Sequence, residues 1–140
     1  MPAAEPGNPS PPAAWMTSQY WKLPLNWEEM IEQVRWAAGG KFSLEVEAPD
    51  TLAVVAELIE QPDQNRRIVH LLNYAAPNGS TVSNIKVEVE LPQGKQARQV
   101  TLLSPDGGEA TTVESRVENG RVSFTVPHLH TYTLAIIQME

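Results

Sequence analysis

The three histidines are the first candidates for chemistry, because imidazole nitrogens bind metal ions and exchange protons near neutral pH. His128 and His130 stand two residues apart, so on an extended strand both side chains would point to the same side. With His70 they would supply the three imidazoles of a catalytic zinc site. No Asp or Glu has a matching spacing, and His70 lies in a strongly apolar stretch. We therefore predict structural histidines and no metal site. His70 is expected to bond a carbonyl or Asn73, and His128 and His130 remain the candidates for a metal.

The motifs of common enzyme classes are missing from the sequence. There is no Gly-x-Ser-x-Gly, P-loop, His-Glu-x-x-His or Gly-x-Gly-x-x-Gly pattern, and no cysteine. Asp50, Asp63 and Asp106 stand in turns, where Asp supports backbone geometry, and other carboxylates alternate with apolar residues. A glycosidase needs two carboxylates that converge in a cleft. The sequence therefore predicts no catalytic residue, no cofactor and no enzyme activity in this chain.

Exposed aromatic rings are the second kind of candidate, because sugar-binding sandwiches stack pyranose rings on Trp or Tyr. Residues 41–140 contain no Trp and only four aromatic residues, which are Phe42, Tyr74, Phe124 and Tyr132. All but Tyr74 are in phase with aliphatic residues and are predicted to be core. Tyr74 and, in the preceding segment, Trp36 are therefore the candidates for carbohydrate binding.

Length and charge exclude several partners. The chain has 140 residues, the size of one ordinary domain, and its formal net charge is −7 from 10 basic and 17 acidic residues. Nucleic-acid binders need a basic stripe, and anionic membrane surfaces attract basic segments. No run approaches the ~18 apolar residues of a membrane span. We predict neither nucleic acid nor membrane as a partner.

The first 40 residues divide into two segments of different composition. Residues 1–14 contain five prolines and no large apolar residue, and we expect a disordered linker. Because the chain opens directly on this linker, we expect it to be a piece of a longer protein. Residues 15–40 hold all four tryptophans and are predicted to be a connecting segment with a helix over about residues 27–38.

The predicted helix has capping signals at both ends. Asn26 is the expected N-cap, with Glu29 completing a capping box and Leu25 stapled against Met30. Two glycines, Gly39 and Gly40, end it. One face carries an apolar stripe, formed by Trp27, Met30, Ile31, Val34 and Ala38.

Trp36 lies opposite the apolar stripe of the helix, on the polar side. Two explanations are open. Either the helix is covered on both sides within this fold, or Trp36 packs on a neighbouring domain. We expect Trp36 to be substantially exposed in this chain.

Beyond residue 40 the apolar period changes from 3.6 to 2. Strands are predicted over about eight segments, 42–48, 52–60, 67–74, 85–91, 96–103, 111–118, 121–126 and 132–136. Asn119-Gly120 is a strong hairpin signal. Alternating charges predict that each sheet has one face in water. Residues 41–140 are therefore predicted to be an all-β, antiparallel two-sheet β-sandwich.

The stretch RIVHLLNY, residues 67–74, resembles part of the C-terminal β-sandwich domains of large bacterial glycoside hydrolases. The similarity is to β-galactosidase-like enzymes with a TIM barrel and an amidotransferase-like middle domain. It also includes VRWAA at 34–38, EAPDTL at 47–52 and VPHLHTYTLAI at 126–136, and it covers about residues 20–140.

The resemblance implies a non-catalytic accessory domain, because the family's catalytic carboxylates lie on barrel strands that this chain does not contain. Its partners would be the catalytic and middle domains of the parent enzyme, and its role would be structural, in bacterial carbohydrate metabolism. The alternative is an autonomous carbohydrate-binding module centred on Tyr74 or Trp36. The two differ in whether these aromatic rings bind sugar.

Overall fold

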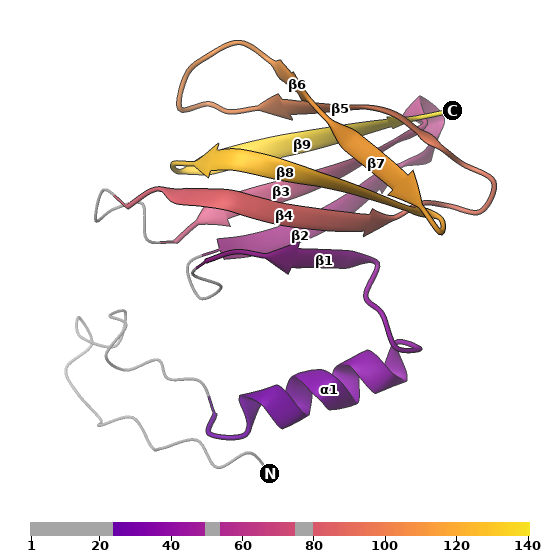
Figure 1. The fold of residues 1–140 in the computed structure, drawn as a ribbon, viewed down its shortest axis with the longest axis vertical. Coiled ribbons are helices and arrows are strands. Elements are labelled where there is room, and N and C mark those ends of the chain that lie inside the picture. Colours follow the sequence, from indigo (N-terminus) through magenta and orange to yellow (C-terminus); the bar gives the residue numbers. More distant parts are fainter. Residues whose placement is uncertain (1–23, 50–53, 75–79) are drawn as a thin grey trace. The chain divides into compact units, whose positions relative to one another are not determined.

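The computed structural model describes residues 24–49, 54–74 and 80–140 (Figure 1). These residues belong to two compact units, a helical one that ends at Phe42 and a β-unit over Ser43–Glu140. The predicted linker at 1–14, Trp15, Trp21 and Asp50 lie outside the described residues. No helix among those described is long and apolar enough to cross a membrane.

The helical unit contains α1, Trp27–Ala37, which begins where predicted and ends one residue earlier. Asn26 is the N-cap, but its φ of −107° and ψ of 29° lie outside the β-region that N-cap residues usually adopt. Its side chain makes no capping hydrogen bond, and Leu25 is exposed. The predicted capping box and staple are therefore wrong. Glu28 and Glu29 in the first turn still favour the positive end of the helix dipole.

The helix ends in a pair of glycines with positive φ. Gly39 donates its N–H to the Trp36 carbonyl (3.1 Å), and Gly40 donates to the Arg35 carbonyl (2.9 Å). The Arg35 guanidinium lies 4.7 Å from the centroid of the Phe42 ring. Phe42 therefore belongs to the helical unit and precedes the first strand, which corrects its assignment to the sandwich core.

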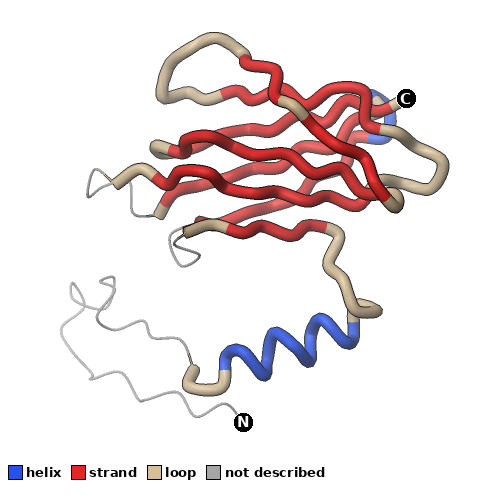
Figure 2. Tube along the Cα trace, viewed as in Figure 1, coloured by secondary structure: helices blue, strands red, loops and turns tan. Residues whose placement is uncertain are grey.

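The β-unit is an antiparallel two-sheet sandwich, as predicted (Figures 1 and 2). One sheet has the order β1-β4-β8-β7 and the other β2-β3-β9-β5-β6. The strands are β1 (Leu44–Glu47), β2 (Val54–Gln61), β3 (Arg66–Asn73), β4 (Val82–Glu90), β5 (Ala97–Leu103), β6 (Thr111–Val113), β7 (Ser115–Glu118), β8 (Arg121–Leu129) and β9 (Tyr132–Met139), with a 3₁₀ turn, η2, at Pro62–Gln64.

Residues 111–118 form two strands instead of the single one expected. Strand β6 pairs with β5 in the five-stranded sheet, whereas β7 pairs with β8 in the four-stranded sheet. The chain passes from one sheet to the other at Glu114, so Val113 and Val117 pack against the same core from opposite sides. The described residues of the sandwich therefore form nine strands. Asn119 (φ 51°) and Gly120 (φ 73°) form the predicted positive-φ turn between β7 and β8.

The core lies between the sheets and is made almost entirely of aliphatic side chains. Val69 and Leu71 of β3 face Ile85, Val87 and Val89 of β4, and all five are essentially inaccessible to water. In strand β9 every second side chain is buried and points inward, namely Thr133, Ala135, Ile137 and Met139.

The side chains of Tyr132, Leu134 and Ile136 lie on the outer face of β9. The prediction that Tyr132 is a core residue is therefore wrong, because the buried phase of β9 begins at the next residue, Thr133. Both phases of this strand are apolar, so alternation alone does not fix which phase faces inward.

Candidate functional site

His70 does not lie with His128 and His130. His70 is on β3 of the five-stranded sheet, and His128 is on β8 of the other sheet. Nδ1 of His128 is 3.1 Å from the Ser83 hydroxyl, and Nδ1 of His130 is 2.9 Å from the Thr81 hydroxyl. In the described part of the chain, no three or more His, Cys, Asp and Glu residues form a group that could hold a metal ion. Both histidines therefore bond side-chain hydroxyls near the start of β4.

His70 is paired with an aromatic residue. Its Nδ1 is 2.5 Å from the Tyr132 hydroxyl, and the two ring centroids are 6.0 Å apart. The predicted partners, a carbonyl or Asn73, are wrong, because His70 is on the outer face of β3 whereas Asn73 is on the inner face. The pair therefore places two polar groups on the outer face of the five-stranded sheet.

Asn73 is a buried structural residue whose role the sequence did not reveal. Its amide Nδ2 lies 2.8 Å from the Ser80 carbonyl, 2.7 Å from the His130 carbonyl and 3.3 Å from the Leu129 carbonyl. Its backbone N–H donates to the Thr131 carbonyl at 2.9 Å. Asn73 therefore fastens the β8–β9 turn to the end of β3.

Asp106 holds the same turn from the opposite side, in the backbone role predicted for a turn Asp. Its Oδ2 accepts the backbone N–H groups of Thr131 (2.7 Å) and Tyr132 (3.2 Å). The pKa of Asp106 is lowered from 3.8, chiefly by the Thr131 backbone bond, against desolvation and with help from Tyr132 and the Thr131 and Ser104 side chains. The carboxylate therefore supports the start of β9.

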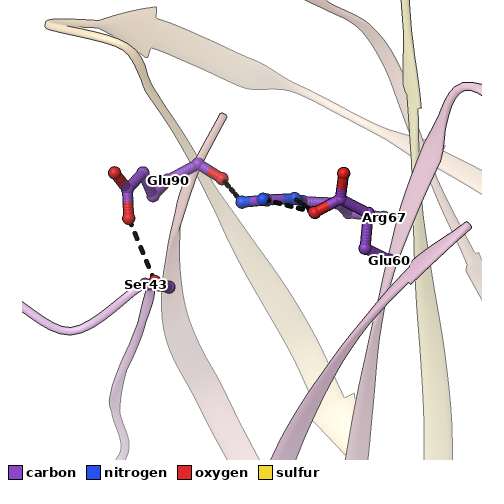
Figure 3. A network of polar contacts seen from close by, with 4 residues as sticks. All are labelled: Ser43, Glu60, Arg67 and Glu90. Carbon is purple, nitrogen blue, oxygen red and sulfur yellow. Dashed lines mark hydrogen bonds and ion pairs between the residues drawn. The ribbon is translucent and has the colours of Figure 1, made fainter. Parts of the chain in front are cut away.

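Arg67 links the two sheets near the other end of β3 (Figure 3). Its Nη2 and Nε lie 2.6 Å and 3.2 Å from Oε2 of Glu60, and its Nη1 donates to the Glu90 carbonyl at the end of β4. Ser43 donates to the Glu90 carboxylate at 3.0 Å. The Arg67 side chain is only 13% exposed. This network is a structural clamp between β3 and β4.

The outer face of the four-stranded sheet, which we call the charged face, carries paired ions. Lys86 contacts Glu47 at 3.0 Å, Arg121 donates to Glu88, and the other residues of the face include Ser123, Thr125, Arg116 and Glu118. The exposed pair Lys86–Glu47 contributes little to stability, whereas the Arg121 side chain is only 11% exposed. This sheet therefore meets the expectation of a polar outer face.

The outer face of the five-stranded sheet carries an apolar patch on β2, β3 and β9, against the expectation of a charged face, and the patch is bordered by Gln61, Arg66, Gln138 and Thr101. None of its large side chains belongs to the core cluster between the sheets, although Ile68 is buried at 8% exposure. Val55 is 49% exposed, and Ile59, Leu72 and Leu103 are each 37% exposed. We call this surface the apolar face and define it by Val55, Glu57, Ile59, Ile68, His70, Leu72, Leu103, Tyr132, Leu134 and Ile136.

The two predicted carbohydrate-binding residues are both exposed. Trp36 is 84% exposed in the helical unit, as its position opposite the apolar stripe predicts, and Tyr74 is 71% exposed directly after β3. Phe124 is buried in the core, as predicted, and Tyr132 is half-buried and bonded to His70. Within the described part of the sandwich, Tyr74 is the single strongly exposed aromatic ring.

The chain is similar to parts of two solved structures. Alpha-L-fucosidase isoenzyme 2 from Paenibacillus thiaminolyticus matches with a TM-score of 0.65 and 23% identity, over 81% of this chain and 18% of that chain. A cycloisomaltooligosaccharide glucanotransferase from a Paenibacillus species, solved with cycloisomaltoheptaose, matches with a TM-score of 0.51 and 19% identity, over 66% of this chain and 16% of that chain. No protein-family model and no curated protein matches the sequence.

These similarities define the fold class. At 23% and 19% identity they show a shared fold, and both names denote enzymes that act on carbohydrates. The chain spans less than a fifth of either neighbour. The fold is therefore an antiparallel β-sandwich of a kind that occurs as a small part of long carbohydrate-active enzymes.

Proposed function

We propose that this chain is a non-catalytic accessory domain of a multidomain glycoside hydrolase, with a structural role against the catalytic and middle domains. The observation that carries the proposal is the apolar face. Contiguous apolar surface of this kind on a sheet is typical of a site that another protein surface covers. The charged face has the opposite character and suits contact with water.

The fold similarities support the same assignment. In the fucosidase and the glucanotransferase the matched region is 18% and 16% of the chain, so most of each chain lies outside it. An accessory role also agrees with the polar clusters of the sandwich. These clusters contain Arg67, Asn73 and Asp106. Each of them bonds to backbone groups of neighbouring strands or turns and so stabilises the fold.

The proposal is tested by expressing the longer polypeptide that it requires, with and without residues 41–140. We expect the 140-residue chain alone to show no turnover of a panel of aryl glycosides. The longer polypeptide should hydrolyse one of them, and removal of the sandwich should lower its thermal stability. Turnover by the 140-residue chain that is abolished by a single Glu or Asp substitution would contradict the proposal.

A carbohydrate-binding module is the second candidate, and the exposure of Tyr74 favours it. An exposed ring can stack on a sugar, although one ring gives a small platform. Titration with oligosaccharides followed by NMR separates the candidates. Binding that Tyr74→Ala or Trp36→Ala removes, and Tyr74→Trp preserves, would support the module. Unchanged spectra up to millimolar sugar would support the structural role.

A further inference from the structure

We infer that the free edge of strand β2 binds an extended segment of another protein, with a basic residue opposite Glu57. The segment adds to the five-stranded sheet as a further antiparallel strand, a common mode of peptide recognition at open sheet edges. The inference goes beyond the proposed function and does not depend on it. The backbone groups of a sheet edge point along the plane of the sheet, so a neighbour that covers a sheet face does not bond them.

Strand β2 is the longest edge strand in the described part of the sandwich. It has eight residues, Val54–Gln61, and it pairs with β3 alone and without a register shift. The other edge strands are β1 and β7, with four residues each, and β6, with three. Short strands, bulges, Pro and Lys protect natural sheet edges from pairing. Strand β2 has none of these, and its charged side chains are Glu57 and Glu60.

Two backbone hydrogen bonds establish which groups of β2 face the free edge. Met139 donates to the Asn65 carbonyl and Asn73 donates to the Thr131 carbonyl, so the odd-numbered residues of β3 bond to β9. Because the bonding side alternates along a strand, the even-numbered residues of β3 bond to β2, where their partners are odd-numbered.

The even-numbered residues of β2 therefore point their N–H and C=O groups away from β3. These residues are Val54, Ala56, Leu58 and Glu60. Among the described residues, no strand of the sheet lies on that side of β2. Four successive donor and acceptor sites are open to an incoming strand.

The outer side chains of β2 define the chemistry of that strand. Val55, Glu57 and Ile59 would stand in the non-hydrogen-bonded pairs of the new ladder, where opposite side chains come closest. Glu57 is exposed and lies between two apolar side chains, those of Val55 and Ile59. Opposite charges across such a pair stabilise a sheet and like charges destabilise it. The incoming strand therefore needs Lys or Arg opposite Glu57 and apolar residues two positions to either side.

Glu57 also disfavours a second copy of this chain as the occupant. An antiparallel copy that uses all four open sites places Val54 opposite Glu60, and so Glu57 opposite Glu57. The net charge of −7 adds repulsion between copies. The described strands that contain Lys or Arg are already paired within the two sheets, and β7, the one of them at an edge, has only four residues. The basic strand therefore comes from another protein.

Amide hydrogen exchange in the 140-residue chain, followed by NMR, tests the inference with the synthetic peptide Thr-Val-Thr-Lys-Thr-Val-Thr. Its Lys stands opposite Glu57 when the two valines face Val55 and Ile59. One control peptide has Glu at the centre, and a second is N-methylated at its third and fifth residues and so lacks two donors toward β2. The amides of Ala56 and Leu58 report on the free edge, whereas that of Val55 is already bonded to β3 and serves as the reference.

At a peptide concentration of about four times Kd, exchange at Ala56 and Leu58 should slow about fivefold, because only the unpaired edge exchanges. Both control peptides should leave these rates unchanged, and Glu57→Lys should reverse the preference, so that the peptide with Glu protects the edge. Unchanged exchange up to millimolar Lys peptide would overturn the inference, and so would equal protection by the Lys and Glu peptides. Protection without peptide that grows with protein concentration would assign the edge to a second copy and overturn it as well. Each of these results leaves the accessory role standing.

Discussion

The two outer faces of the sandwich present different side chains to water on the same strand geometry. On the charged face, Lys86 pairs with Glu47 and Arg121 with Glu88, so both central strands, β4 and β8, carry charged side chains. On the apolar face, Ile59, Ile68 and Ile136 lie side by side, and Glu57 is its acidic residue.

Under the proposed function, this difference indicates which side of the sandwich a neighbouring domain covers. Both sheets bury their inner faces in one core, so packing within the sandwich gives no reason for apolar residues on an outer face. Solvated charges make the four-stranded sheet suitable for water, whereas exposed isoleucine and leucine favour association. The asymmetry follows if the five-stranded sheet is covered in the working protein.

The largest expected loss of stability comes from removing Arg67, and it is compared with removing Lys86 from a more exposed ion pair. Arg67→Ala removes the donor to the Glu90 carbonyl and to the Glu60 carboxylate, and should lower the free energy of unfolding by about 1.5–3 kcal/mol, because the Arg67 side chain is 13% exposed although that of Glu60 is 41% exposed. Lys86→Ala on the charged face should cost less than about 1 kcal/mol, because that pair is exposed. Urea denaturation of the 140-residue chain measures both. Equal losses would contradict the clamp between the sheets.

The hairpin on the charged face gives the next largest effect. Gly120 has φ 73°, which a β-branched side chain resists, so Gly120→Val should destabilise the sandwich by roughly 1–3 kcal/mol. Gly120→Asn is the control, because Asn tolerates positive φ. A denaturation midpoint that does not move in Gly120→Val would show that the β7–β8 turn contributes nothing to stability.

The smallest expected loss of stability comes from Asp106, which supports the start of β9, the strand at the centre of the apolar face. Its folded pKa lies below 3.8, so its stabilisation is present above the unfolded pKa and is lost as the pH falls through the folded value. Asp106→Asn should lower the denaturation midpoint slightly at pH 7. That gap should close as the pH falls below about 3.8, where the native carboxylate also becomes protonated. A gap that is independent of pH would show that the charge of Asp106 is not what supports β9.

Strong local signals in the sequence predict much of the fold. The two-sheet sandwich follows from alternation in strands such as β4, where Ile85, Val87 and Val89 are core and Lys86 and Glu88 are not. The Asn-Gly pair predicts its hairpin because few other residues adopt two successive positive φ values.

The features that local signals missed depend on long-range contacts. The step at Glu114 is invisible in the sequence, because Val113 and Val117 stand four residues apart and keep the same phase of an alternating strand across it. The inward phase of β9 is ambiguous because both phases are apolar. Asn73 and Arg67 have partners 57 and 23 residues away, which no spacing rule connects to them. The apolar face escaped prediction because it needs the pairing of β2, β3 and β9.

The most direct test of the central claim is calorimetry of the longer polypeptide with one charge added to each outer face in turn. If the apolar face is the docking surface, the sandwich and its neighbour unfold in one cooperative transition. Leu72→Glu should then split that transition in two, whereas Thr125→Glu leaves it single. The 140-residue chain with Leu72→Glu should unfold near the native midpoint, because Leu72 lies outside the core. A single, unshifted transition in the longer Leu72→Glu polypeptide would contradict the account.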